Sequence, residues 1–483
     1  RYKVVDHSKI QEALTYDDVL IIPKYSNISS RKNVDISSQL TPKIKLNIPM
    51  VSGNMDTVTE SRMAIAMARL GGIGIIHRYL PIKDQVHEII KVKRAEAIVI
   101  DKPFTLTPEH TLKDAKILME ENNINGILIT DNASRFEGIL TRRDMMFEDN
   151  LLMPICDIMT KRSDAVTADF GIDIEKAKLI MKNNKVEKLP LLDKSGILKG
   201  LVTAKDLSRK DSYPLTVKDK KGRLLVGAAI GVKGDYLERA EALIDAGCDV
   251  LCIDIAHGHS ELAINALKTV KDKFSDIEVI AGNIVTEMAA FDLIKAGADC
   301  IKCGVGSGSI CVTRLVAGAG YPQFSALLNC VRVGNDFNIP VMADGGIGGL
   351  AGNFSKAIAA GASTVMRSRS LAGTDESPGL SIMKNGKKFK IYRGSASFGA
   401  NMARNERNHE KVDEEYNPEG VEALIPYSGS VEEVIKPFLS GLRSGMSYVG
   451  ANNIKEFWDK AEFVRMTQSG IKESYPHDVE LVK

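Results

Sequence analysis

The chain has 483 residues, 44% of them hydrophobic and 26% charged, which describes an ordinary globular protein of roughly two to four domains. Its 64 basic and 62 acidic residues almost cancel, so the charge does not point to nucleic acid or to an anionic membrane surface. The longest apolar runs are strand-sized, well short of the ~20 residues that a membrane-spanning helix needs. We therefore expect neither nucleic acid nor a membrane as a partner.

The seven cysteines are an odd number scattered over predicted strands and helices, which favours a reducing compartment over a disulfide framework. We expect the cytoplasm or another reducing intracellular compartment. Since the chain opens at Arg1 without a methionine, trimmed termini and an organelle signal stay open. Cys300 and Cys303 form a CxxC, but no second pair and no histidine ligands lie at zinc spacing, so we interpret both as strand residues.

Residues 1–92 are interpreted as the first part of a parallel α/β domain. The run Ile48-Pro-Met-Val-Ser-Gly-Asn-Met55 is apolar and broken by a glycine, and a helical pattern follows from Glu60 to Leu70. The next run, Gly71-Gly-Ile-Gly-Ile-Ile-His77-Arg78, predicts a strand that ends in polar groups. Strand, helix and strand in quick succession indicate a parallel βα unit.

An internal repeat occupies residues 93–213. Each copy predicts strand, helix, strand, strand, helix, and each carries Thr-x-x-Asp where the last strand meets the last helix, at Thr141 to Asp144 and at Thr203 to Asp206. The threonine can cap the helix there, and the aspartate can accept ribose hydroxyls. The duplicated spacing favours a nucleotide-binding pair over two plain helix caps. The insert resembles a tandem CBS (Bateman) module.

Residues 214–483 return to buried strands and contain a second repeat. A helix that ends at Ala-Gly turns directly into a strand in 245–254, in 295–304 and in 359–367. Polar or glycine residues recur at the carboxyl ends of the strands, where (β/α)8 barrels place their sites. The predicted fold is therefore α/β, a TIM barrel made of 1–92 and 214–483 with the repeat inserted.

One strand leads into Gly304-Val-Gly-Ser-Gly-Ser-Ile-Cys311-Val-Thr313-Arg314. Three glycines in five residues let the backbone take positive φ and approach a ligand, with its dipoles free to bind ions. Cys311 leaves this turn beside a hydroxyl and a guanidinium, a setting that favours a thiolate. The loop shares one rim with other polar strand ends, so we interpret Cys311 as a nucleophile and not as an incidental buried cysteine.

Late loops of such barrels bind phosphate through backbone N–H groups. Asp344-Gly-Gly and the stretch from Ser368 to Gly373 fit this position, and Arg369 would add charge-assisted hydrogen bonds.

On these motifs the chain resembles the family of IMP dehydrogenase and GMP reductase over nearly its whole length, and the loop that carries Cys311 matches the family's catalytic loop. The resemblance implies that the thiolate of Cys311 attacks C2 of a purine mononucleotide. Hydride then passes to or from a nicotinamide cofactor, and Thr313 helps to activate water or ammonia. It also implies cofactor contacts at Asp254 and Ser260, and a monovalent cation such as potassium on the backbone oxygens of Gly306, Gly308 and Cys311.

The resemblance further implies a substrate pocket. Its residues hold the ribose phosphate or line the base, with Glu419 at the purine edge: Met55, Asn283, Ser309, Asp344, Gly346, Ser368, Arg369, Tyr392, Gly394 and Glu419.

The resemblance implies a mobile flap at about 395–425, and it breaks there. The family's dehydrogenases hydrolyse the cysteine adduct with an Arg-Tyr pair, whereas this chain has Glu406-Arg-Asn-His-Glu410. Loss of that pair predicts a GMP reductase that uses NADPH and releases ammonia, with Glu406 or Glu410 as the acid. IMP dehydrogenase with NAD stays open, because Arg407-Asn408 or Asn408-His409 can form a variant pair that activates water. A third reading is a non-catalytic nucleotide sensor.

The resemblance also implies regulation. Purine nucleotides at the CBS pair would couple purine levels to activity or assembly. Family barrels associate as homotetramers, and CBS pairs can join two tetramers into an octamer.

Overall fold

The computed structural model describes residues 10–95, 99–100, 103–209, 213–397, 399 and 418–479. It divides into two compact units. The first consists of Arg1–Val92, Leu215–Val217 and Leu225–Lys483, and the second of Lys93–Pro214 and Lys218–Leu224. The second unit therefore extends beyond the predicted insert by residue 214 and by the segment 218–224. In the described part of the chain, no helix is both long and apolar enough to cross a bilayer.

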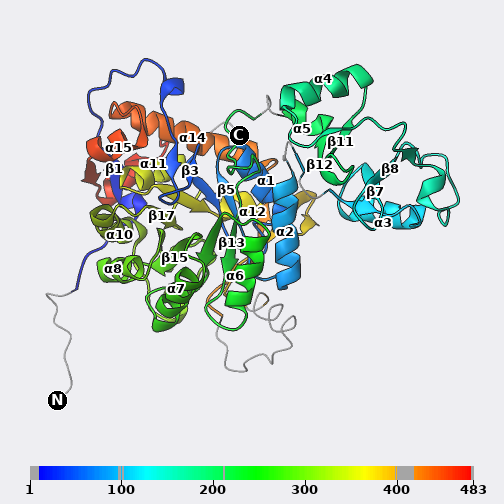
Figure 1. The fold of residues 1–483 in the computed structure, drawn as a ribbon. Coiled ribbons are helices and arrows are strands. Elements are labelled where there is room, and N and C mark those ends of the chain that lie inside the picture. The colour runs from blue at the N-terminus through cyan, green and yellow to red at the C-terminus, as the bar shows by residue number, and fades with distance from the viewer. Residues whose placement is uncertain are drawn as a thin grey trace. The chain divides into compact units, whose positions relative to one another are not determined.

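Eight parallel strands close into a barrel in the first unit (Figure 1). Each strand pairs with the next along the chain, and the last pairs with the first, with Val365 opposite Met50. The strands are β4 (Met50–Ser52), β5 (Ile73–Ile76), β13 (Gly227–Ile230), β14 (Val250–Ile253), β15 (Glu278–Ile284), β16 (Cys300–Cys303), β17 (Val341–Asp344) and β18 (Thr364–Arg367). The predicted TIM barrel is confirmed.

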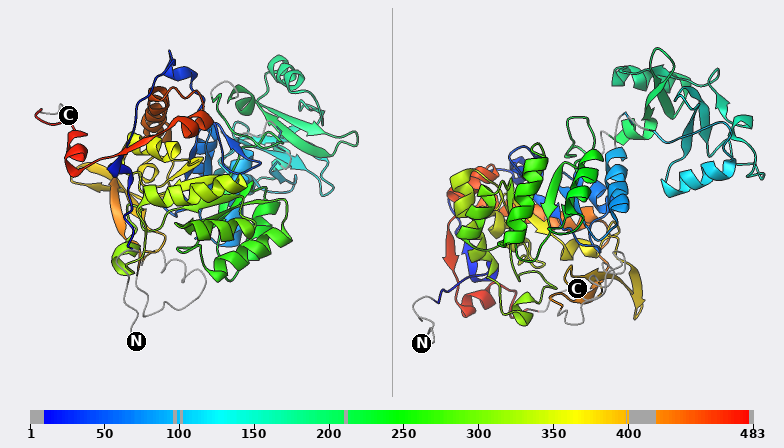
Figure 2. Two further views of the ribbon diagram at one scale, coloured as in Figure 1. Left: turned by 90° about the vertical axis from the view of Figure 1, so that its left-hand side faces the viewer. Right: turned by 60° about the horizontal axis from the view of Figure 1, so that its bottom comes forward.

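The barrel strands are short apolar runs because helices cover their outer face and side chains fill the interior. Every residue of β5 and of β14 is buried. Helices surround the strands, as the right-hand view of Figure 2 shows. They are α1 (Ser61–Arg69), α2 (Ile82–Arg94), α6 (Tyr236–Asp245), α7 (Glu261–Lys273), α8 (Glu287–Lys295), α10 (Gln323–Phe337), α11 (Ala351–Ala359) and α14 (Val431–Tyr448).

The repeated Ala-Gly steps form the hinges between helix and strand. Gly247, Gly297 and Gly361 take φ values of 96°, 102° and 107°, a conformation that glycine adopts without a steric penalty. Each hinge then leads within three residues into β14, β16 or β18. This regular step brings the carboxyl ends of the strands to one rim.

A small antiparallel sheet follows the last barrel strand. The short helix α12 (Arg369–Ala372) leads into β19 (Ser381–Lys384), β20 (Lys387–Arg393) and β21 (Glu422–Pro426), which pair in that order. Part of the predicted flap is therefore the regular strand β21. Within that stretch, residues 398 and 400–417 lie outside the described part of the chain.

The second unit repeats one motif. The first copy contains β6 (Thr105–Leu106), α3 (Leu112–Glu121), β7 (Gly126–Thr130), β8 (Phe136–Thr141) and β9 (Thr160–Lys161). The second contains β10 (Ala168–Asp169), α4 (Ile174–Asn184), β11 (Lys188–Leu192), β12 (Leu198–Thr203) and α5 (Ala204–Arg209). Leu128 and Phe136 of the first copy pack with Leu192 and Leu201 of the second in one buried cluster. The two copies thus share a core.

The helix predicted after β8 is wrong. Residues 142–147 form turns there, whereas α5 follows β12 in the second copy. One carboxylate oxygen of Asp144 accepts hydrogen bonds from both the N–H and the hydroxyl of Thr141, at 2.7 Å each. The same two bonds between Thr111 and Asp114 open the helix α3, so the difference lies in the residues after Asp144, which continue through turns.

Candidate active site

A cavity of about 1110 Å³ opens at the carboxyl ends of the barrel strands. Its wall contains nearly all the residues that the sequence analysis assigned to the barrel site. Those at its wall are Met55, Asp254, Asn283, Gly306, Gly308, Ser309, Cys311, Thr313, Asp344, Gly346, Ser368, Arg369, Tyr392, Gly394 and Glu419.

Two glycines shape the loop that carries Cys311. Gly304 and Gly306 take φ values of 145° and 77°, in the region that side chains rarely enter. A Cβ atom on Gly304 would lie 2.0 Å from the backbone oxygen of Asp344, so a side chain cannot fit there. Gly308 is not among the glycines of positive φ. Only two of the three glycines in the motif are therefore needed for their backbone conformation.

The hydroxyl of Thr313 lies between a thiol and a carboxylate. The Sγ atom of Cys311 is 3.2 Å from Oγ1 of Thr313, and that hydroxyl donates to Oε2 of Glu419 at 2.7 Å. A carboxylate that accepts from a hydroxyl can take a proton through it. The three side chains form a hydrogen-bonded row at the cavity wall, and Glu419 is its only carboxylate.

Backbone pairing holds Glu419 in this place. The N–H of Val312 donates to the backbone oxygen of Glu419 at 2.8 Å, and Cys311 forms an antiparallel bridge with Gly420. The N–H groups of Glu419 and Gly420 both donate to the backbone oxygen of Ala396, at 3.1 Å each. The segments on either side of 398–417 thus meet beside the cysteine.

Arg314 does not play the part that the sequence suggested. Its guanidinium donates to the backbone oxygen of Tyr321, and its side chain packs against Gly306 and Gly320. The guanidinium of Arg314 therefore stabilises the conformation of the loop through the backbone of Tyr321. The group that the structure places next to the sulfur of Cys311 is the hydroxyl of Thr313.

Two polar side chains, one half-buried and one buried, meet Asp344 at the end of β17. Asn283 donates from Nδ2 to the backbone oxygen of Gly304 at 2.8 Å and to Oδ2 of Asp344 at 2.9 Å. Lys302 lies 3.5 Å from the same carboxylate oxygen. Burial opposes the charge of Lys302, but Cys252, Asp344 and Asp254 together raise the pKa of its ammonium. Lys302 therefore stays charged inside the barrel mouth.

Asp254, at the end of β14, is paired with Arg78. The Nε atom of Arg78 donates to Oδ2 of Asp254 at 2.7 Å. Burial alone would raise the pKa of Asp254, but Arg78 and Lys302 lower it below its ordinary value. The cavity thus contains a carboxylate that stays ionised and faces any ligand with hydroxyl groups.

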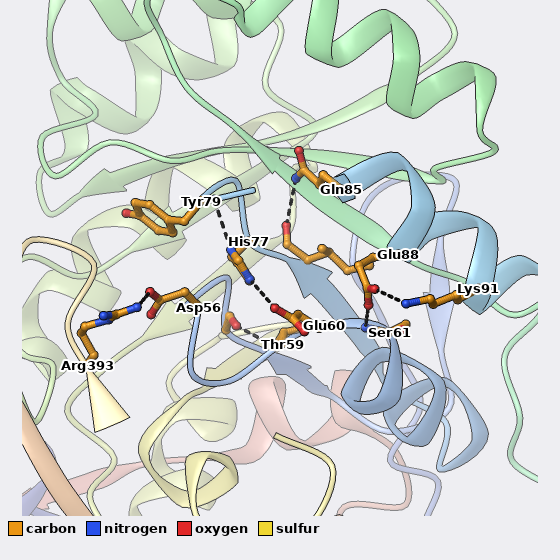
Figure 3. A network of polar contacts seen from close by, with 12 residues as sticks. Asp56, Thr59, Glu60, Ser61, His77, Tyr79, Gln85, Glu88, Lys91 and Arg393 are labelled. Carbon is orange, nitrogen blue, oxygen red and sulfur yellow. Dashed lines mark hydrogen bonds and ion pairs between the residues drawn. The ribbon is translucent and has the colours of Figure 1, made fainter. Parts of the chain in front are cut away.

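Figure 3 shows the polar groups next to this corner. Nδ1 of His77 accepts from the N–H of Tyr79 at 3.1 Å, so the proton of a neutral ring is on Nε2, which faces Glu60 at 3.1 Å. Asp56 forms an ion pair with Arg393 at the end of β20. These contacts tie the loops after β4 and β5 to the strand that carries Tyr392.

Arg367 ends β18 and lines the cavity beside Ser368 and Arg369. Its Nη2 donates to the backbone oxygen of Gly348 at 2.8 Å, and its guanidinium lies 4.4 Å from the ring centre of Phe438. Burial lowers the pKa of Arg367 to about 10. An anion at this end of the cavity would meet two guanidinium groups.

The sequence analysis missed Lys302 and Arg367, although each left a signal. Both interrupt an apolar strand, in Cys-Ile-Lys-Cys and in Thr-Val-Met-Arg. A charged residue in a buried strand requires a partner, so it marks a polar site. The Cys300 and Cys303 pair is a run of strand residues, as interpreted, and both thiols are buried.

Some predicted site residues lie elsewhere. Ser260 accepts the N–H of Ala263 as the N-cap of α7 and is not among the residues that line the cavity. Glu406 falls outside the described residues. Thr141, Asp144 and Thr203 belong to the second unit, and the side chain of Asp206 is not described.

Comparison with known proteins finds relatives over the whole length. A family model described as the IMP dehydrogenase / GMP reductase domain matches residues 13–477. The inosine-5'-monophosphate dehydrogenase of Nitrosopumilus maritimus (strain SCM1) is 50% identical over 479 residues, covering 98% of this chain and 100% of the relative. That of Aquifex aeolicus (strain VF5) is 47% identical over 479 residues, with 98% and 97% covered.

Solved structures are similar as well. A GMP reductase variant from Trypanosoma brucei, in complex with guanosine 5'-monophosphate, is 44% identical with a TM-score of 0.91, covering 98% of this chain and 99% of that chain. A GMP reductase from the same organism, in complex with guanosine 5'-triphosphate, is 40% identical with a TM-score of 0.80. The likeness of fold does not separate the two activities.

The prediction of a GMP reductase is contradicted by the curated relatives. Those named inosine-5'-monophosphate dehydrogenase are 44% to 50% identical to the chain and cover 98% of it. The prediction rested on the missing Arg-Tyr pair with Cys311 and Thr313 retained, and it placed Glu419 at the purine edge without its bond to Thr313. With a family model matched over residues 13–477, the chain belongs to the IMP dehydrogenase/GMP reductase family.

Proposed function

We propose that this protein is an IMP dehydrogenase, which converts IMP, NAD and water to XMP and NADH. The observation that carries the proposal is the hydroxyl of Thr313 held between the thiol of Cys311 and the carboxylate of Glu419. The names of the full-length relatives favour oxidation of IMP as the direction. A hydrolytic step needs a base near the cysteine adduct, and Glu419 is placed to be that base.

Cys311 acts first. Its thiolate attacks C2 of the purine, and the hydrogen on C2 leaves as hydride, so that a thioimidate remains on the sulfur. NAD, when bound, accepts this hydride. Water then adds to C2 while Thr313 passes the water's proton to Glu419 at 2.7 Å. Cleavage of the carbon–sulfur bond releases XMP and restores the thiol of Cys311.

The remaining polar groups of the cavity bind the two nucleotides. Ribose hydroxyls would donate to Asp344 on the purine side and to Asp254 on the NAD side, because both carboxylates line the cavity next to cationic partners. Ser368 and Arg369 would hold the phosphate of IMP at the start of α12. These are the roles that the family resemblance predicted for the same residues.

Three finer proposals belong to the same function. The backbone oxygens of Gly306, Gly308 and Cys311 would hold a monovalent cation such as potassium, although the oxygen of Gly308 already accepts the N–H of Cys311 at 3.1 Å. The second unit would be a CBS pair that binds regulatory purine nucleotides near Thr141 and Thr203. The barrels would assemble as homotetramers or octamers.

Absorbance at 340 nm tests the proposal. Purified protein with IMP and NAD should gain absorbance as NADH forms, and Cys311→Ser should abolish the gain. Control mixtures contain GMP with NADPH. A loss of absorbance in those mixtures, with no gain from IMP and NAD, would overturn the proposed direction.

A further inference from the structure

Tyr79 lies between the cofactor carboxylate and the turn next to Glu419. It follows β5 and is buried, with 6% of its surface exposed. Its hydroxyl is 3.4 Å from Oδ2 of Asp254 and 3.3 Å from the backbone oxygen of Ser395. A hydroxyl has one proton, so it can donate fully to only one of these two acceptors at a time.

Both distances are long for an O–H···O hydrogen bond, which is commonly ~2.7 Å. The hydroxyl can therefore shorten one bond only by lengthening the other. Burial and the nearby charge of Asp254 raise the pKa of Tyr79, so the proton stays on the phenol. The ring of Tyr79 stacks on His77, with the ring centres 6.0 Å apart, and this contact holds it in place (Figure 3).

A continuous row of contacts connects Ser395 to the thiol. Ser395 lies in the turn that the N–H of Ser397 closes on the oxygen of Gly394 at 3.0 Å. The next oxygen in this turn, that of Ala396, accepts the N–H groups of Glu419 and Gly420. The carboxylate of Glu419 in turn accepts from the hydroxyl of Thr313.

We propose that Tyr79 is a positioning residue whose hydroxyl is shared between Asp254 and Ser395, so that a ligand hydroxyl bound to Asp254 tightens the turn that holds Glu419. The inference rests on the proposed placement of NAD at Asp254. A ribose hydroxyl would supply Asp254 with a better donor and release the proton of Tyr79 to Ser395. Binding of NAD would thereby restrict the movement of Glu419, the base that hydrolysis needs.

Amide hydrogen exchange of the peptide that contains Glu419 and Gly420 tests the link without substrate or cofactor. In the full-length protein, Tyr79→Phe should speed this exchange about 2- to 5-fold, because it removes one weak hydrogen bond from the turn. Asp254→Ala should slow it, because Tyr79 then has one acceptor left. The double variant should behave like Tyr79→Phe.

Tyr427→Phe is the matched control. That hydroxyl also binds a carboxylate, Asp375 at 2.9 Å, but it is exposed and Tyr427 does not line the cavity. Its loss should leave the exchange of the 419–420 peptide unchanged. Equal exchange in Tyr79→Phe and wild type would overturn the proposal, and so would an unaltered rate in Asp254→Ala.

Stopped-flow kinetics distinguish the proposed role of Tyr79 from a simple loosening of the cofactor site. Tyr79→Phe should leave the first-turnover burst of NADH intact and slow the steady state about 2- to 5-fold, since only the hydrolytic group is affected. A slowed burst would mean that the residue serves cofactor binding alone and would overturn the inference. If the exchange results hold but IMP and NAD give no NADH, the proposed function fails and the link stands.

Discussion

At the scale of single residues, Arg78 keeps the cofactor carboxylate ionised. Burial would raise the pKa of Asp254, and the charges of Arg78 and Lys302 lower it. In Arg78→Met the pKa of the Asp254 carboxyl should rise, because the closest cation is gone. In the proposed function Asp254 binds the cofactor in its ionised form, which is present above its pKa, so cofactor binding should be lost as the pH falls.

The pH profile of kcat/KM for NAD measures this effect. The acid limb of Arg78→Met should move to higher pH, while Arg78→Lys should stay near the wild type. Coincident acid limbs in Arg78→Met and the wild type would show that Asp254 does not control cofactor binding.

The second prediction for a single residue concerns Glu419. Glu419→Gln keeps an oxygen that Thr313 can donate to at 2.7 Å, but an amide cannot take a proton. Turnover should fall about 10²- to 10⁴-fold, the usual contribution of a general base. The NADH burst should persist, because hydride leaves before water attacks. Rapid mixing of enzyme, IMP and NAD will show this, and loss of the burst itself would place Glu419 in substrate binding instead.

The residues that sequence reasoning found and missed differ in kind. Asp344 ends a predicted strand and Cys311 lies in the loop that follows another, and the barrel rule alone brings such positions together. Tyr79, which the sequence analysis did not name, and Glu419, which it placed only at the purine edge, make contacts across distant segments, such as the bond from Thr313 to Glu419, 106 residues apart. No local periodicity encodes a contact of that kind.

At the scale of elements, the turn after β16 depends on Gly304. A Cβ atom there would lie 2.0 Å from the backbone oxygen of Asp344, so β16 and β17 would have to separate at the rim. Gly304→Ala should destabilise the barrel by about 2–4 kcal/mol and abolish most activity. The thermal midpoint and the rate of NADH formation measure the two effects.

Gly318→Ala is the control for this change. Gly318 also has a positive φ, 66°, but a Cβ atom there meets nothing within 4 Å. The substitution should lower the free energy of unfolding by only ~1 kcal/mol, the cost of the left-handed backbone conformation, and the activity should be kept. Equal losses in both variants would mean that φ, and not the contact with β17, determines the need for Gly304.

Element prediction succeeded where a pattern repeats. The Ala-Gly hinges recur, and each places a strand in the barrel. It failed after β8, where Thr-x-x-Asp closes a turn, whereas the same pattern after β12 leads into α5. The residues after Asp144 make the difference, because they continue through turns in which the side chains of Met146 and Phe147 are exposed. The sequence motif alone cannot distinguish the two outcomes.

At the scale of the whole molecule, the barrel closes entirely within the first unit. All eight of its strands belong to that unit. The ends of the insertion are tied together, because Nζ of Lys93 lies 3.1 Å from Oδ2 of Asp219 and donates to the backbone oxygen of Leu224 at 2.9 Å. A short Gly-Ser linker in place of residues 96–212, with Lys93 and 218–224 kept, should therefore leave the barrel folded.

The shortened protein should oxidise IMP within about 2-fold of the full-length rate, since every residue of the cavity wall lies in the first unit. Its response to added ATP or GTP should disappear, because the proposed nucleotide sites leave with the repeat. The rate of NADH formation with and without each nucleotide, in both proteins, checks these outcomes. A shortened protein that is folded by circular dichroism but inactive would mean that the inserted unit is needed to complete the site. A response that survives the deletion would place the regulatory nucleotide in the barrel.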